Sequence, residues 1–496
     1  MPGVRQIKGK MSKSQENLKD VTFICERVIW YLKQKPEELI EYLKEHRLDA
    51  LYSISDPNRG MIICGLEASK RFTDIAKRFL STQEEKKRKA NLSKFIGNLK
   101  EEFSRRFIQR GEEISQRNID RMIASAYKRT SKKFESVRHF VPCAIFLTKN
   151  IKSFEVGPVQ FLHESKFFDS YKEEIQALRE EIKVDHQARC RSAVSEGFPE
   201  DRIATEKQSE HLANRLVDGL LDFYTQYEWF AVVDIGECDS TVSYDKAVFT
   251  TKTALNILKL LLGGQYTDRL RTAQDYGLPH KSAKLTRGAD GKLDISLSSI
   301  PGGNVLGDDW FEFLSTKAEY FFKLASRALA FSVEFSEIPP LCTRFIDSLS
   351  WYGDAILEKS PAAKIVKYVS SIERMTGTGI ESDENGNERG VTEIVTSRSS
   401  ILYSNATGKS LVDCFREVNH IYECRSNLLH GSISPFDDSV VSDSYKAEEI
   451  SRLILLTGLD FFNSLGLDNP TMNQRQLRGY YNDLEKMHLQ MKKNNA

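Results

Sequence analysis

The spacing of apolar residues changes twice along this 496-residue chain, which limits what it can fold into. From about Ser14 to Lys133, apolar residues recur three and four positions apart, as in amphipathic helices. Beyond Arg138 they form short continuous runs, at Phe140 to Leu147 and Phe154 to Leu162, as in buried strands. Helical spacing returns after Ile338. We therefore expect a mostly α protein with an α+β region between two helical regions.

The chain is too long for one ordinary hydrophobic core, so several domains are expected. We predict a basic helical region at residues 1–137, an α+β region of unknown family at 138–335, a helical bundle at 336–483 and a disordered polar tail at 484–496. Within the α+β region, the sequence predicts a loop from Arg191 to Asp201, a buried strand from Trp229 to Ile235, an apolar helix from Ala247 to Leu262 and a hairpin from Lys284 to Ser299.

In the predicted bundle, one helix is expected to begin at Ser360 and Pro361, which form an N-cap followed by a proline at the first helical position. Further helices are expected at Phe345 to Leu357, Val391 to Tyr403 and Tyr445 to Ser464, the last with Gly458 inside it.

Eight cysteines are scattered through the chain without a CxxC pair or a Cys/His cluster at ligand spacing. This argues against structural zinc and against a disulfide framework, and it is typical of a reducing compartment. No run of apolar residues approaches the ~18 needed to cross a bilayer. We expect a cytoplasmic protein that does not associate with membranes.

Charge is unevenly distributed. Between Lys70 and Arg138 there are 20 Lys/Arg against 9 Asp/Glu, whereas between Glu337 and Tyr480 there are 14 against 20. The run Lys86, Lys87, Arg88 and Lys89 is a candidate RNA-binding surface, since such clusters release counterions from phosphate backbones. A solvated helical face, or a face docked on the acidic region of the same chain, would have the same composition. The interleaved aromatic residues follow helical spacing and are expected in the core.

Acidic residues of the central region raise the possibility of a metal-dependent nuclease. They include Asp234, Glu237, Asp239, Asp290 and Asp294. A restriction-type site needs a carboxylate on one strand and Glu-x-Lys on the next. That spacing is absent, so solvated strand ends and turns are the favoured interpretation and no metal site is predicted.

One predicted helix ends in Tyr422-Glu-Cys-Arg425-Ser426-Asn427-Leu-Leu-His430-Gly431. Arg425 falls on the apolar face, so it either has a carboxylate partner or lines a site. A regular helix turns about 140° over five residues, which separates Arg425 from His430. Gly431 is the expected stop, and a loosened last turn would let His430 fold back toward Arg425. A histidine at this position also interacts favourably with the helix dipole without any catalytic role.

This stretch resembles the Apea-like branch of the HEPN superfamily, and the segment Ser360-Pro361 through Ile372-Glu373 resembles the second helix of that family. The resemblance covers about Ile338 to Leu465. It implies a homodimer in which an Arg-x(4–6)-His motif from each protomer meets at a cleft and cleaves RNA without metal or cofactor. Arg425 and His430 match that motif as catalytic residues, with Ser426 and Asn427 in support. Ser432 stands where some members carry a regulatory tyrosine.

The resemblance implies an endoribonuclease that attacks through the RNA 2′-OH and leaves a 2′,3′-cyclic phosphate. Cleavage needs a group that takes the 2′-OH proton and positive charge for the developing phosphorane, which His and Arg supply. A role in anti-phage defence or as a growth-arresting toxin is expected, with tRNA or mRNA as substrate and an unknown trigger. The alternative is a non-catalytic HEPN scaffold that binds RNA or a partner protein.

Overall fold

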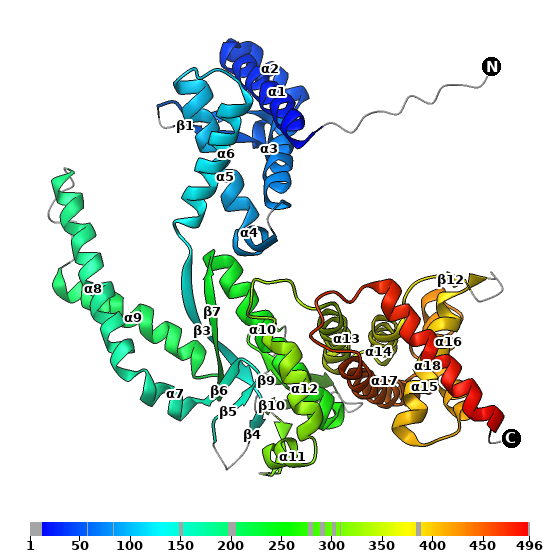
Figure 1. Ribbon diagram of the computed structural model, residues 1–496. Helices are drawn as coiled ribbons and strands as arrows, with labels where there is room; N and C mark the ends of the chain where they lie inside the picture. The colour runs from blue at the N-terminus through cyan, green and yellow to red at the C-terminus, as the bar shows by residue number, and fades with distance from the viewer. Residues whose placement is uncertain are drawn as a thin grey trace, which may run out of the picture. The chain divides into compact units, whose positions relative to one another are not determined.

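The computed structural model describes residues 12–494, apart from 57, 83, 148–151, 197–204, 276–280, 288–292, 300–303, 308 and 383–387. The chain forms two compact units (Figure 1). The N-terminal unit contains Met1–Val137, Ile235–Lys246 and Glu334–Glu337; the larger unit contains Arg138–Asp234, Ala247–Val333 and Ile338–Ala496. The protein is mostly helical with an α+β central region, so the predicted fold class is confirmed. Among the described residues, we find no helix with the length and apolar character that crossing a bilayer requires.

The N-terminal unit is helical apart from one hairpin. Its main helices are α1 (Lys13–Lys33), α2 (Pro36–Glu45), α3 (Gly65–Leu80), α4 (Glu84–Lys89), α5 (Leu92–Phe103) and α6 (Gln116–Ser131), with a 3-10 turn η1 (Asp49–Leu51) and a π-helix η2 (Ser104–Gln109). The strands β1 (Ser53–Asp56) and β2 (Gly60–Ile63) pair antiparallel. The sequence did not predict these strands, because four-residue strands show little periodicity.

Aromatic side chains form much of the core of this unit. Phe72, Phe95 and Phe103 are fully buried, and Phe79 and Tyr127 pack beside them. The expectation that these residues belong to the core is therefore confirmed, and they are not base-stacking platforms.

A five-stranded sheet in the order β5-β6-β7-β3-β8 forms the centre of the α+β region. Its strands are β3 (Glu135–Ala144), β5 (Phe154–Val156), β6 (Val159–His163), β7 (Trp229–Cys238) and β8 (Arg271–Thr272). β7 is the middle strand, and its residues 229–233 are buried, as the apolar run predicted. Two further pairs are β4 (Phe146–Leu147) with β11 (Asn304–Val305), and β9 (Lys281–Arg287) with β10 (Leu293–Ser299). The last pair is the predicted hairpin; the tip of its turn lies outside the described residues.

The α+β region also contains helices that lie between or after the strands in the sequence. They are α7 (Glu164–Ser170), α8 (Lys172–Ser195), α9 (Glu206–Tyr224), α10 (Ser240–Leu262), the 3-10 turn η4 (Gly264–Tyr266), α11 (Trp310–Thr316) and α12 (Glu319–Ala330). α8 continues to Ser195, so the loop predicted from Arg191 was wrong at its start. The glycine and proline behind that prediction come only at 197 and 199, and nothing before them breaks a helix. The rest of that predicted loop lies outside the described residues, apart from Glu196.

The C-terminal part of the larger unit is a bundle of α13 (Pro340–Leu357), α14 (Pro361–Thr376), α15 (Val391–Thr407), α16 (Leu411–His430), α17 (Asp438–Ser464) and α18 (Gln474–Asn494), with a short pair β12 (Glu381–Ser382) and β13 (Glu388–Arg389). α14 packs against α13, α15, α16 and α17. Ser360 caps α14 by accepting a hydrogen bond from the amide of Ala363, as predicted. Gly458 of α17 is a packing residue, since a Cβ there would lie 2.4 Å from Met375 Cε.

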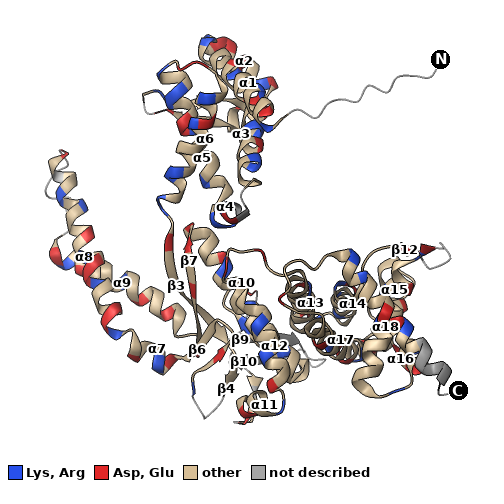
Figure 2. Cartoon of the chain, in the orientation of Figure 1, with Lys and Arg blue, Asp and Glu red and all other residues tan. Residues whose placement is uncertain are grey.

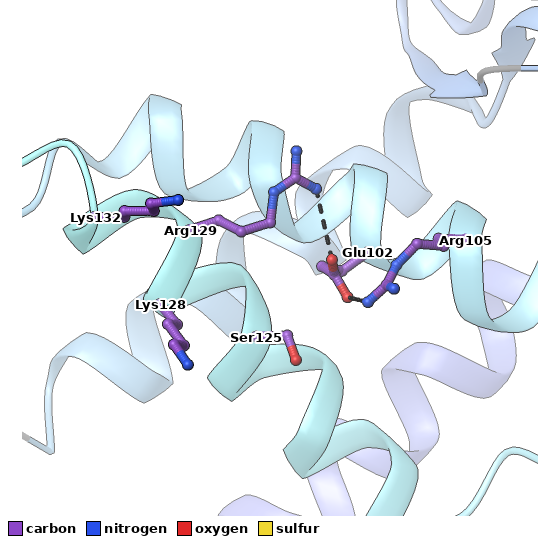
Figure 3. Close-up of a pocket in the computed structure, with 6 residues that line it drawn as sticks. All are labelled: Glu102, Arg105, Ser125, Lys128, Arg129 and Lys132. Atoms are coloured by element: carbon purple, nitrogen blue, oxygen red, sulfur yellow. Dashed lines mark hydrogen bonds and ion pairs between the residues drawn. The ribbon is translucent and has the colours of Figure 1, made fainter.

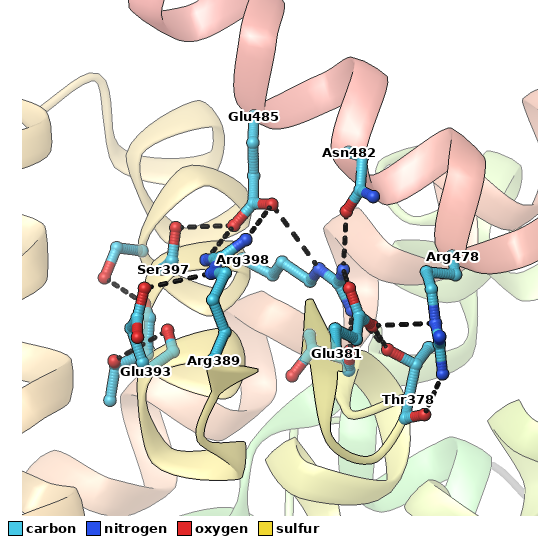
Figure 4. A network of polar contacts seen from close by, with 12 residues as sticks. Thr378, Glu381, Arg389, Glu393, Ser397, Arg398, Arg478, Asn482 and Glu485 are labelled. Carbon is cyan, nitrogen blue, oxygen red and sulfur yellow. Dashed lines mark hydrogen bonds and ion pairs between the residues drawn. The ribbon is translucent and has the colours of Figure 1, made fainter. Parts of the chain in front are cut away.

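The segment predicted as a disordered tail from 484 is instead the second half of α18. Tyr481 of this helix is fully buried, and Glu485 is 9% exposed. Figure 4 shows Glu485 joining a polar network with Arg389, Ser397 and Arg398. Composition suggested a tail because the residues are polar. The partners of Glu485 in this network lie about ninety positions earlier in the chain.

Candidate functional site

The site predicted from the sequence lies at the C-terminal end of α16. This helix starts at the N-cap Ser410, whose hydroxyl accepts from the amide of Asp413. It ends at Gly431, which adopts a left-handed φ of 76° and donates its N–H to the carbonyl of Asn427. The predicted stop is confirmed. The helix stays regular through His430, so the predicted loosening of the last turn was wrong.

Arg425 has a carboxylate partner on α14. Its Nη2 lies 3.6 Å from Glu373 Oε2, and the Tyr422 hydroxyl donates to Glu373 Oε1 at 2.5 Å. Burial, followed by the hydrogen bond to Glu373, raises the pKa of Tyr422 to about 12, so this hydroxyl stays protonated at neutral pH. The side chain of Arg425 is 27% exposed, and its guanidinium lies 5.8 Å from the centre of the Tyr422 ring.

The pairing of Arg425 is incomplete. A distance of 3.6 Å is an ion pair rather than a hydrogen bond. Its Nε is buried without a hydrogen-bond partner. That buried Nε is not open to a ligand, but the Nη groups make no hydrogen bond within the part of the chain that the structure describes. On this partly exposed side chain they are the donors that a phosphate oxygen could accept from.

His430 is exposed at the last position of α16, next to Leu429, which is 56% exposed. Ser426 and Asn427 are half-buried. Because α16 is regular over this stretch, the side chains of Arg425 and His430 leave the helix about 140° apart. No hydrogen bond or ion pair joins these two residues, both of which the structure describes. Within one copy of the protein, α16 therefore does not bring the side chains of Arg425 and His430 together.

Sequence reasoning missed Glu373 as the partner of Arg425, although it lies in the segment that carries the family resemblance. It also missed a neighbouring cluster in which His420 Nε2 lies 3.0 Å from Asp443 Oδ1. Cys424 lies one turn further along α16, and burial with the nearby Asp443 raises its pKa to about 11. A thiol held protonated in this way is a poor nucleophile. Nothing in the local sequence indicated which α17 residue would face α16.

The basic run predicted to bind RNA lies on α4, and Figure 2 shows the surrounding basic residues on α5 and α6. Lys86 Nζ lies 4.9 Å from the centre of the Tyr127 ring, and Lys89 Nζ lies 2.7 Å from Glu85 Oε1. Arg88 donates to the carbonyl of Phe335. The side chain of Lys87 lies outside the described residues. Three of the four cations therefore have partners within their own unit.

The acidic residues of the central region are not gathered into a metal site among the described residues. Asp234 accepts two hydrogen bonds of 2.8 Å from Arg138, and Asp239 lies 2.9 Å from Lys94 Nζ. Glu237 is exposed. Asp290 and the side chain of Asp294 lie outside the described residues. All eight cysteines are free thiols.

Comparison of the chain with protein-family models, with curated proteins and with solved structures gave no match.

Proposed function

We propose that the protein is a metal-independent endoribonuclease of the HEPN type that uses Arg425 and His430 of two copies. The observation that carries the proposal is the incomplete pairing of Arg425, which holds a charged guanidinium with unused donors at a partly exposed position. The donors in question are its Nη groups, which make no hydrogen bond among the described residues. A phosphate group could accept from Arg425 while Glu373 keeps the guanidinium oriented.

In this mechanism, His430 takes the proton of the RNA 2′-OH, and Arg425 stabilises the charge that develops on the phosphorane. The 2′-oxygen bonds to phosphorus and the 5′-oxygen leaves, which gives a 2′,3′-cyclic phosphate and a 5′-OH. The five-residue step along α16 argues that each site combines Arg425 of one copy with His430 of the other, since a single helix separates them.

Exposed apolar side chains lie where α16 ends and α17 begins, and they support self-association there. Leu429 is 56% exposed, Phe436 94%, Val441 47% and Tyr445 66%. An apolar surface of this kind beside polar groups is typical of protein interfaces. A C2 dimer would bring the same end of α16 from both copies to one cleft. The proposed role is RNA cleavage in the cytoplasm, in anti-phage defence or as a toxin.

The test is cleavage of mixed tRNA and mRNA by the purified protein in EDTA, with the ends of the products identified. Arg425→Ala and His430→Ala are each expected to lower the rate by about 10²–10⁴-fold. Arg416→Ala and His420→Ala are matched controls, because both residues lie on α16 and are more than half exposed. Full activity in either site variant, or cleavage that needs a divalent metal, would contradict the proposal.

A second candidate is a non-catalytic dimeric scaffold of the same type, and the ion pair between Arg425 and Glu373 favours it. In that case Arg425 would only join α16 to α14. Expression of the wild-type and His430→Ala proteins in a bacterial host separates the two. Growth arrest by the wild type alone supports the nuclease, whereas equal growth supports the scaffold.

A further inference from the structure

A hollow on the N-terminal unit, far from α16 in the sequence, is lined by basic side chains. It is a shallow depression, open to solvent, with a volume of about 490 Å³. Its lining residues are Glu102, Arg105, Ser125, Lys128, Arg129 and Lys132, shown in Figure 3. It is independent of the proposed nuclease, since every lining residue belongs to the N-terminal unit.

Two packed helical segments build the hollow. α6 supplies Ser125, Lys128 and Arg129, and its C-cap residue is Lys132; their spacing of three, four and seven places them on one face. α5, which packs against α6, supplies Glu102. Arg105 comes from the π-helix η2 that continues α5, and π-helical turns are frequent at functional sites.

A buried carboxylate orients the arginines. The Glu102 side chain is only 3% exposed and forms an ion pair with Arg105 (Figure 3), while its Oε1 lies 3.5 Å from Arg129 Nη1. Arg106, just behind the hollow, lies 3.4 Å from the same carboxylate. Burial of Glu102 makes such pairing obligatory. Arg129 also lies 2.5 Å from Glu101, so both arginines are held in place.

Positive charge exceeds negative charge at the lining. The lining residues include four cations and the carboxylate of Glu102, and Glu101, paired with Arg129, adds a second carboxylate beside them, which leaves an excess of two positive charges. Lys128 and Lys132 are exposed and form no ion pair among the described residues. The Arg105 Nε is buried without a hydrogen-bond partner. Lysines near the C-terminal end of a helix also interact favourably with its unpaired backbone carbonyls. Positive charge alone would therefore not define a binding site. Here the positively charged side chains surround a hollow, and carboxylates already hold Arg105 and Arg129 in place.

We propose that this hollow binds the polyphosphate group of a nucleotide or of a free polyphosphate chain. Arginine presents paired donors that match phosphate oxygens, and lysine adds point charges. No aromatic side chain is among the described residues that line the hollow, so nothing there stacks on a base. Affinity therefore follows the number of phosphates and depends little on the base.

The test is titration calorimetry of the full-length protein at low salt with tripolyphosphate, ATP, GTP and AMP. We expect saturable binding of the first three and much weaker binding of AMP. Similar affinities for tripolyphosphate and ATP would identify the phosphate chain as the ligand. Tighter binding of both ATP and GTP would identify a nucleotide.

The variant is Lys128→Glu with Lys132→Glu, expected to weaken tripolyphosphate binding by at least about tenfold. The matched control is Lys19→Glu with Lys33→Glu, which makes the same charge change at exposed positions of α1 in the same unit. Circular dichroism checks that both variants fold. Arg129→Ala, at a side chain that is 48% exposed, is a second variant expected to weaken binding.

No saturable binding of tripolyphosphate would overturn the proposal. So would equal loss of binding in the variant and the control, or unchanged binding in both lining variants. Binding of a single-stranded RNA oligonucleotide without binding of tripolyphosphate would assign these cations to a nucleic-acid surface instead. Because the readout is binding and not RNA cleavage, its failure is distinct from failure of the proposed nuclease.

Discussion

Two arginines of the C-terminal bundle differ in how completely they are paired. The Arg398 side chain is 0% exposed, and its Nη atoms donate to Thr378 Oγ1 at 2.6 Å, Glu381 Oε2 at 2.8 Å and Asn482 Oδ1 at 2.9 Å (Figure 4). Arg425 is 27% exposed and has one carboxylate at 3.6 Å. A guanidinium is costly to bury unless its donors are satisfied. The Nε of each arginine is buried without a hydrogen-bond partner, so the difference lies in the Nη groups, which are hydrogen-bonded in Arg398 and not in Arg425 among the described residues. The first pattern indicates a residue kept for folding, and the second a residue with capacity to bind.

The largest expected effect comes from mixing Arg425→Ala protein with His430→Ala protein. If each site takes Arg425 from one copy and His430 from the other, a mixed dimer has one intact site. Random pairing then restores about a quarter of wild-type cleavage, because half the dimers are mixed and each has one site of two. Each variant alone is expected to remain nearly inactive. RNA cleavage after co-refolding measures this, and no recovery would contradict a shared site.

The next effect is on stability. Arg398→Ala removes the centre of a buried network and leaves Glu381, 2% exposed, without its closer cationic partner. We expect the free energy of unfolding to fall by about 3–5 kcal/mol. Arg425→Ala is expected to cost less than about 1 kcal/mol, because its one ion pair is partly exposed. Urea denaturation of both variants checks the contrast, and equal losses would make Arg425 a structural residue.

A smaller effect is expected from Tyr422→Phe. The change removes the hydrogen bond to Glu373 and keeps the ring beside Arg425. We expect a loss of about 1 kcal/mol of unfolding free energy, because one partly buried hydrogen bond is removed. Cleavage should fall by far less than in Arg425→Ala. A loss of activity as large as that of Arg425→Ala would mean that Glu373 positioning, rather than the guanidinium, limits the reaction.

The smallest effect concerns Glu358, a half-buried carboxyl between α13 and α14. A hydrogen bond from Lys367 Nζ, together with the Ser360 and Lys359 amides, lowers its pKa from about 4.5 to about 2. A lowered pKa means that the carboxylate stabilises the fold above about pH 4.5, and that this contribution is lost as the pH falls toward 2. Glu358→Gln should therefore cost less than about 1 kcal/mol at pH 7 and almost nothing at pH 2. The urea denaturation midpoints of the wild type and Glu358→Gln, compared at pH 7 and at pH 2, measure this difference in stability.

Much of the fold followed from the sequence because helix ends depend on nearby residues. Ser360, Pro361 and Gly431 mark helix ends where the structure has them, and the apolar runs at 140–147 and 229–235 are strands. One error, the predicted tail from 484, arose because polar composition was taken for disorder. Residues 484–494 are helical in a segment whose Tyr481 donates to the carbonyl of Met375 in α14 and whose Glu485 accepts from Arg389 and from Ser397 of α15, and the local sequence does not reveal these partners.

The candidate site was predicted only in part. The sequence indicated that Arg425 needs a carboxylate or a cleft, and that Gly431 ends the helix after His430. It did not identify Glu373, which lies 52 positions before Arg425, nor the pairing of His420 with Asp443. The basic hollow was also not predicted, since the sequence pointed to Lys86–Lys89 rather than to α6.

The sequence by itself determined those helix and strand ends that depend on nearby residues, since caps, glycine conformation and apolar spacing act over a few residues. Only the tertiary structure decided which charges meet. Arg398 with Glu381 and Glu485, Arg425 with Glu373, and Glu102 with Arg129 all join residues of different elements. Those pairings depend on how helices pack, and packing sets whether a guanidinium is satisfied by the protein or left with donors for a ligand.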